Sequence, residues 1–91
     1  MKILRTEKMK TRGGHPAKNQ FIVHTDEGRY FISYTSLVAF KSFDGKVTLD
    51  GDTWDYSTTT NRYRNDFLGE YVVDTMKKIE DGEYVLANLN S

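Results

Sequence analysis

Apolar and polar positions alternate in the first half of the chain with the two-residue period of β-strands. Residues 20–25 (QFIVHT) and 29–34 (RYFISY) are rich in β-branched and aromatic side chains, and Asp26, Glu27 and Gly28 separate them. A short loop that ends in glycine is typical of a hairpin whose glycine takes the left-handed conformation beside a bulge. The pattern predicts a β-hairpin.

A second pair of strands is expected over residues 36–43 (SLVAFKSF) and 46–50 (KVTLD). Asp44 and Gly45 stand between them, and this dipeptide is favoured in tight type I′ hairpin turns. Because the two hairpins follow each other directly, they predict an antiparallel meander of about four strands.

The period changes after Trp54. Ser and Thr occupy positions 57–60, and their hydroxyls can accept hydrogen bonds from unpaired N–H groups in the first turn of a helix. Tyr63 and Phe67 follow at a spacing of four, and Gly69 stands where a helix commonly ends. This pattern predicts a short helix between the Ser-Thr run and the glycine.

A second helix is expected over residues 70–81, where Val72, Met76 and Ile79 form an apolar stripe at helical spacing. Residues 83–89 (EYVLANL) then favour a final strand that adds to the sheet. The predicted fold class is α+β: an antiparallel β-meander of about four strands followed by two short helices and a final strand. The helices are expected on one face of the sheet.

The N-terminal part of the chain is less regular. Its first eleven residues are compatible with a short strand or a frayed helix, and residues 11–19 contain Gly-Gly and the single proline, which favour a loop. The first twenty residues carry six basic side chains and one acidic, a net charge of +5, whereas the other 71 carry seven basic and twelve acidic, a net charge of −5. We therefore divide the chain into a basic N-terminal arm, residues 1–18, and a single α+β domain, residues 19–91.

Composition narrows the class of protein. A chain of 91 residues can build one modest core, and its 13% of aromatic residues is too high for a disordered chain. Cysteine is absent, which excludes disulfides and thiolate metal sites. No apolar run is long enough for a membrane span or a signal peptide. We expect a soluble protein of the cytoplasm.

Candidate catalytic and metal-binding residues are few. The two histidines, His15 and His24, stand in a predicted loop and a predicted strand, and the sequence has no nucleophile elbow, zinc-helix motif or phosphate loop. Asp50, Asp52 and Asp55 are interpreted as turn-forming residues between a strand and a helix, with a weak divalent-cation site as the lesser alternative. We expect a protein that is not an enzyme, with no catalytic residue, cofactor or metal.

One segment combines aromatic and charged side chains of the types enriched at protein interfaces. Its candidate partner-binding residues are Trp54, Asp55, Tyr56, Arg62 and Arg64. The alternative interpretation is structural: Tyr63 lies in the core, the aromatic residues anchor the helix, and the arginines are solvated.

The basic arm offers a different kind of site. Its candidate nucleic-acid-binding residues are Lys8, Lys10, Arg12 and Lys18, since clustered cations can neutralise phosphates. The arm has no aromatic residue, which removes the base stacking that single-strand binding uses.

Three stretches of the sequence together carry a resemblance: residues 19–40, 47–70 and 77–90. They contain the elements S-Y-x-S with a following Ala, W-D-Y-S-x-T-T before a helix that ends F-L-G, and K-K-I-x-x-G-E-Y. In these elements the chain resembles a family of small phage-encoded domains of unknown function. The resemblance covers about residues 19–90 and implies a phage product in the bacterial cytoplasm. It supplies no activity, cofactor or catalytic residue.

These observations give one leading hypothesis and two alternatives. The leading hypothesis is a non-enzymatic protein that binds a host protein stoichiometrically and inhibits a bacterial defence system such as a CRISPR nuclease, as small phage proteins often do. The first alternative is a nucleic-acid-binding protein that uses the arm. The second is an accessory phage protein that self-assembles.

Overall fold

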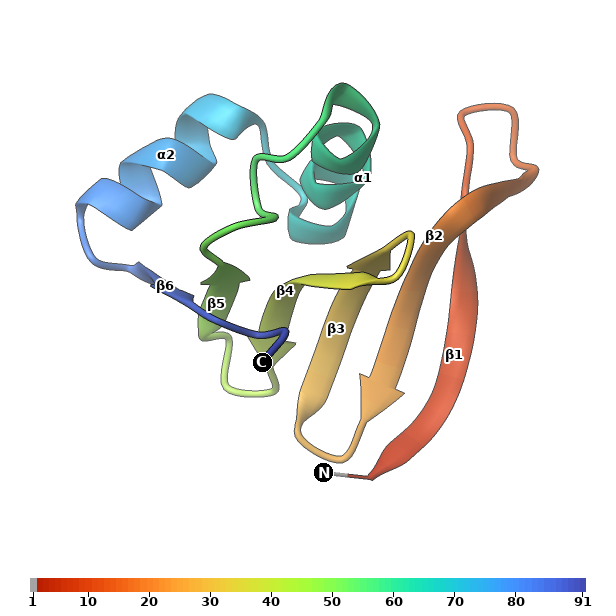
Figure 1. The fold of residues 1–91 in the computed structure, drawn as a ribbon, viewed down its shortest axis with the longest axis horizontal. Helices are drawn as coiled ribbons and strands as arrows, with labels where there is room; N and C mark the ends of the chain where they lie inside the picture. Colours follow the sequence, from red (N-terminus) through yellow and green to blue (C-terminus); the bar gives the residue numbers. More distant parts are fainter. Residues whose placement is uncertain (1) are drawn as a thin grey trace.

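The computed structural model describes residues 2–91, which form one six-stranded sheet and two helices (Figure 1). The elements in chain order are β1 (Ile3–Lys10), β2 (Pro16–Thr25), β3 (Gly28–Ser33), β4 (Ser36–Ser42), β5 (Val47–Asp50), α1 (Thr58–Leu68), α2 (Val72–Glu80) and β6 (Tyr84–Ala87). Strands lie in the sheet in chain order. The first five are antiparallel, and β6 pairs in parallel with β5. The predicted α+β fold class is confirmed.

Both predicted hairpins are present, but Gly28 acts differently from the expectation. Its φ of +153° lies outside the left-handed helical region. A Cβ atom at this position would stand 2.3 Å from the Lys41 carbonyl oxygen, so glycine is required by the close approach of β4. Gly45, in the second hairpin, has φ +89° in open surroundings, but Asp44 is not among the residues with positive φ, so the turn is not the type I′ turn that this dipeptide favours.

The expected N-terminal arm is part of the sheet. Residues 3–10 form β1, which pairs with β2 from Ile3 opposite Thr25 to Lys10 opposite Pro16. Met9 and Ala17 are buried and belong to the hydrophobic core. The division of the chain after residue 18 is therefore corrected: the arm and the domain share one sheet and one core.

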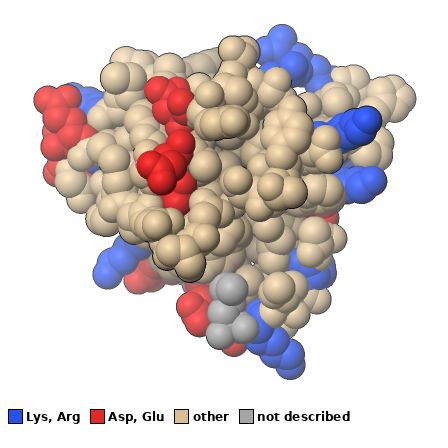
Figure 2. Space-filling model, in the orientation of Figure 1, with Lys and Arg blue, Asp and Glu red and all other residues tan. Residues whose placement is uncertain are grey.

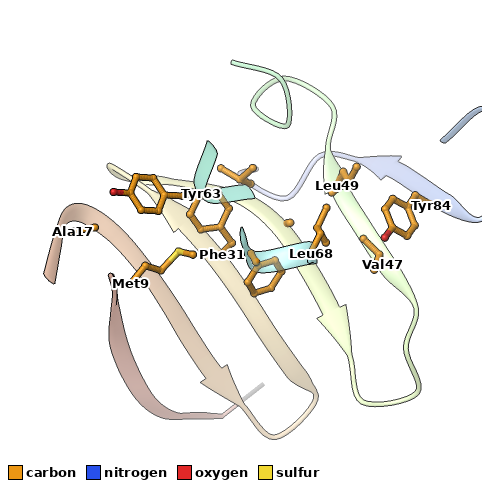
Figure 3. Packing of buried hydrophobic residues seen from close by; sticks show 11 residues of the cluster. Met9, Ala17, Phe31, Val47, Leu49, Tyr63, Leu68 and Tyr84 are labelled. Carbon is orange, nitrogen blue, oxygen red and sulfur yellow. The ribbon is translucent and has the colours of Figure 1, made fainter. Parts of the chain in front are cut away.

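Helix α1 begins and ends where the sequence predicts. Ser57 is its N-cap and accepts a hydrogen bond from the Thr60 N–H, and Gly69 ends it in the left-handed conformation. The inner face of the helix brings Tyr63, Phe67 and Leu68 onto the sheet, where the Phe67 ring lies 5.9 Å from that of Phe31. Figure 3 shows Phe31, Tyr63 and Leu68 within the cluster of buried residues that joins helix and sheet.

Helix α2 packs through a different face from the one expected. Of the predicted stripe only Ile79 packs against the core, whereas Val72 and Met76 are exposed. The residue of α2 that is fully buried is Thr75. Its hydroxyl donates to the Glu70 carboxylate over 2.5 Å, so a polar contact orients this helix.

Glu70 connects the two helices to β6. Its side chain is 8% exposed and also accepts hydrogen bonds from Lys78 Nζ at 2.7 Å and the Tyr84 hydroxyl at 2.8 Å. Burial alone would raise the pKa of Glu70, but hydrogen bonds from Lys78, Thr75 and Tyr84 hold it below its ordinary value. This buried carboxylate is charged, and its partners fix α2 beside the edge of the sheet.

A second buried carboxylate, Asp50, holds the end of β5. Its Oδ2 atom accepts from the N–H groups of Asp52 and Thr53 and from the Thr53 hydroxyl, and its Oδ1 atom accepts from the Leu89 N–H at 2.8 Å. Burial opposes ionisation of Asp50, but these hydrogen bonds lower its pKa below the ordinary value of 3.8. The carboxylate thus joins the turn after β5 to the C-terminal residues.

Replacement of Asp50 by Asn tests this junction with almost no change in shape. An amide puts an N–H₂ group against at least one N–H donor, so we expect Asp50→Asn to lower the free energy of unfolding at pH 7 by about 2–3 kcal/mol. Because folding depresses the pKa of Asp50, its ionisation stabilises the fold above pH 3.8 and stops doing so as the pH falls through the folded-state pKa. Urea titrations across pH should show the two proteins converging below pH 3.8. An equal difference at every pH contradicts a role for the ionised carboxylate.

Candidate functional site

A groove of about 560 Å³ lies between the turn that joins β3 to β4 and the N-terminal end of α1. Ten residues line it: Ser33, Tyr34, Thr35, Ser36, Val38, Thr53, Tyr56, Ser57, Thr59 and Thr60. All ten come from two segments, 33–38 and 53–60, which hold the S-Y-x-S and W-D-Y-S-x-T-T elements of the sequence. The fold therefore brings together two motifs that are about twenty residues apart in the chain.

Hydroxyl groups dominate the lining of the groove, and those at its base are already paired. Ser33 and Thr60 share a hydrogen bond of 2.9 Å between their side-chain oxygens, and the Ser57 hydroxyl donates to Thr60 over 3.1 Å. The Thr53 hydroxyl shares its proton between Asp50 Oδ2 at 2.9 Å and the Leu37 carbonyl at 2.8 Å. These bonds fix the base of the groove and join α1 to β3 and the residue 53 turn to β4.

The hydroxyls toward the outside of the groove are available to a ligand. Within residues 2–91, the side chains of Thr35, Ser36 and Thr59 make no hydrogen bond to another residue. Each hydroxyl can donate one hydrogen bond and accept two. The groove can therefore recognise a polar segment without a change in its own base.

Two exposed tyrosines complete the lining. Tyr56 is 72% exposed and Tyr34 is 52% exposed. Tyr34 has φ +58°, a left-handed conformation that costs a residue with a Cβ atom about 1–2 kcal/mol. Its N–H donates to the carbonyl of Asn19, which also has a positive φ, over 2.7 Å. The turn is therefore held in an unfavourable backbone conformation, and this conformation places the Tyr34 ring at the groove.

The five predicted partner-binding residues are divided by the structure, and Arg64 is a correction. Its side chain is completely buried, not solvated or on an interface. The guanidinium donates to the Trp54 carbonyl, to Asn61 Oδ1 at 3.1 Å and to Asn65 Oδ1 at 3.0 Å, and it stacks 5.3 Å from the Trp54 ring. Trp54 is half-buried and packs against the core. These two residues anchor the loop that carries Tyr56.

The other members of the predicted set reach the surface. Asp55 accepts a hydrogen bond of 2.6 Å from Asn61 and lies 4.0 Å from Arg64. Arg62 is exposed, with its guanidinium 5.7 Å from the centre of the Tyr63 ring. Tyr56 is the member of the predicted set that lines the groove. The candidate set predicted from the sequence does not include Tyr34, Thr35 or Ser36. The pattern predicts strands over residues 29–34 and 36–43, and the residue types give no sign of the turn conformation at Tyr34.

Two of the titratable residues considered for chemistry, His24 and Asp50, are engaged in structural contacts. His24 makes a hydrogen bond of 2.7 Å with Glu7, and this bond lowers the pKa of Glu7. The Asp50 carboxylate accepts hydrogen bonds from backbone N–H groups of the following turn, in agreement with its interpretation as a turn former. In the part of the chain that the structure describes, no three His, Cys, Asp or Glu side chains lie together as metal ligands, and neither helix has the length and apolarity to cross a membrane.

Fold and groove together define a small α+β domain with a hydroxyl-lined surface site. The chain belongs to a family of unknown function (DUF8033), whose model matches residues 5–84. No curated protein and no solved structure matches it. The family match begins within β1 and includes the whole groove, so the N-terminal strand belongs to the family domain.

The two neighbouring arginines of α1 give a matched test of the anchor. Arg64→Ala leaves part-buried oxygens of Trp54, Asn61 and Asn65 without their donor and opens a cavity, so we expect a loss of about 3 kcal/mol in the free energy of unfolding. Arg62→Ala removes an exposed side chain over a ring and should cost less than about 1 kcal/mol. Urea unfolding of both variants checks the difference. Equal losses contradict the anchoring role of Arg64.

Proposed function

We propose that this chain is a non-enzymatic binding protein that acts by stoichiometric contact with a protein partner, and that the groove is its contact site. The observation that carries this proposal is the pair of exposed tyrosines, Tyr34 and Tyr56, beside unpaired hydroxyls. Tyrosine is enriched at the energetic centres of interfaces, because it brings a large apolar surface and a polar tip with little loss of side-chain entropy.

The conformation of Tyr34 supports the proposal independently. Glycine or asparagine would satisfy the turn at lower cost, so the fold tolerates strain in order to hold this ring at the groove. Strain of this kind is concentrated at functional sites, where the surrounding structure enforces it. Here the Asn19 carbonyl and the Ser33–Thr60 hydrogen bond enforce it from two sides.

The size of the molecule is sufficient for such a role. Its accessible surface is 5898 Å², and a specific interface needs about 800 Å² from each partner. A groove of about 560 Å³ accommodates an extended segment or a protruding loop of the partner. Thr35, Ser36 and Thr59 would pair with its backbone groups, and the two rings would cover its side chains.

The partner that we propose is a bacterial defence protein such as a CRISPR nuclease, bound in the host cytoplasm. Two features support this narrower proposal. The two sequence elements that meet at the groove are among those in which the chain resembles small phage-encoded domains. Residues 21–91 also carry a net charge of −5, which complements the basic channel of a nuclease.

Substitutions on the groove give the sharpest test. Tyr56→Ala and Tyr34→Gly each remove one ring, and we expect each to weaken capture of the partner by tagged protein at least tenfold. Phe43→Ala is the matched control, because Phe43 is 73% exposed at the turn between β4 and β5, outside the groove. Quantitative pull-down from host lysate, followed by biolayer interferometry with the purified partner, measures the three variants.

The same variants separate binding from folding. Tyr34→Gly relieves the left-handed strain, so its free energy of unfolding should stay within about 1 kcal/mol of the parent or rise. A plasmid-interference assay with the co-expressed chain tests the defence target and should show protection that both tyrosine variants lose. Absence of any stoichiometric protein partner, or equal loss with Phe43→Ala, overturns the groove as the contact site.

A further inference from the structure

The hairpin formed by β1 and β2 projects from the rest of the molecule as a two-stranded ribbon (Figure 1). We call residues 8–18 the basic ribbon. Its turn is closed by two backbone hydrogen bonds, from the Thr11 N–H to the His15 carbonyl at 2.8 Å and from the Gly14 N–H to the Thr11 carbonyl at 3.0 Å. Met9 and Ala17 anchor the ribbon in the core, so its conformation is set before any partner binds.

The charge of the basic ribbon is of one sign. Lys8, Lys10, Arg12 and Lys18 are all exposed, and residues 8–25 contain no Asp or Glu. In residues 2–91 none of the four forms an ion pair with an acidic side chain. Arg64 and Lys78, by contrast, each have a carboxylate within 4.0 Å. The ribbon thus presents four cations whose charge the protein itself leaves unpaired.

The opposite charges lie elsewhere on the molecule. Figure 2 shows Lys and Arg along the side that β1 and β2 form, with others at the opposite and lower edges, whereas Asp and Glu lie mainly in the half away from β1 and β2. Most acidic residues belong to the segment after residue 43. At physiological ionic strength charges separated by more than about 8 Å are largely screened, so acidic side chains beyond that distance do not cancel the local field of the ribbon.

From this arrangement we infer that the basic ribbon binds the phosphate backbone of duplex DNA. A two-stranded ribbon fits the DNA major groove, which is about 12 Å wide, and its cations then face phosphates on both sides. The first twenty residues contain no aromatic side chain for stacking, which disfavours single strands. The deep, narrow major groove of duplex RNA does not admit a ribbon. The inference uses a surface separate from the groove, since no ribbon residue lines the groove.

Fluorescence anisotropy with a labelled duplex of about 20 base pairs tests the inference over a salt series. Four phosphate contacts predict a slope of about −3.6 for log K against log salt. The variant Lys8→Gln, Lys10→Gln, Arg12→Gln, Lys18→Gln should bind at least thirtyfold more weakly at about 50 mM salt and lose most of the slope. Single strands and duplex RNA of the same length should bind more weakly than duplex DNA.

A control with the same net charge distinguishes the ribbon from charge in general. The four substitutions Lys41→Gln, Lys46→Gln, Arg62→Gln and Lys77→Gln lower the net charge equally but lie on the body of the domain. They should change duplex binding by less than about threefold. No binding of duplex DNA at low salt, an equal effect of both sets, or tighter binding of duplex RNA overturns the inference. Neither set touches Tyr34 or Tyr56, so failure here leaves the protein-binding proposal intact.

Discussion

The buried carboxylate of Asp50 is the interaction on which most of the structure depends. It lies at the end of β5, where four donors from the following turn and from Leu89 converge on its two oxygens. The single proton of one of those donors, the Thr53 hydroxyl, is shared with the Leu37 carbonyl of β4, whose oxygen lies 2.8 Å from the hydroxyl oxygen. A single charged group therefore sets the direction in which the chain leaves the sheet and returns to it. Because the group is buried, each of these donors is needed to offset the loss of its hydration.

The shape of the groove depends on the hydrogen bonds around Asp50. Thr53 begins the segment that carries Tyr56, and Arg64 holds the next residue of that segment through the Trp54 carbonyl. The opposite wall is the turn at Tyr34, which the Asn19 carbonyl holds from β2. Both walls are thus rigidly supported, whereas the groups that face outward are unpaired. Such a division, with a fixed base and free polar groups above it, suits recognition of a partner with little rearrangement.

The parts of the fold that sequence reasoning predicted well are those that short-range chemistry determines. Ser57 and Gly69 bound α1 because a hydroxyl cap and a left-handed glycine are local requirements. The parts it missed depend on tertiary contacts. Arg64 reads as a surface residue until Trp54, Asn61 and Asn65 surround it. The N-terminal segment has the sequence pattern of a basic arm, because Met9 is the one buried side chain of β1 and lysines stand on both sides of it. The side of the groove formed by residues 33–38 could likewise not be predicted, because it depends on the left-handed conformation of Tyr34.

The parallel pairing of β6 has a consequence for how the chain folds. Strands β1 to β5 join neighbours in sequence, so each hairpin forms from local contacts that close quickly. The last strand can pair only after residues 51–83 have been folded into two helices that bring it back alongside β5. During synthesis the edge of β5 therefore stays unpaired until residues 84–87 have been made. Completion of the sheet, the Leu89 bond to Asp50 and the contact of Asn90 with Leu37 therefore belong to one late, cooperative step.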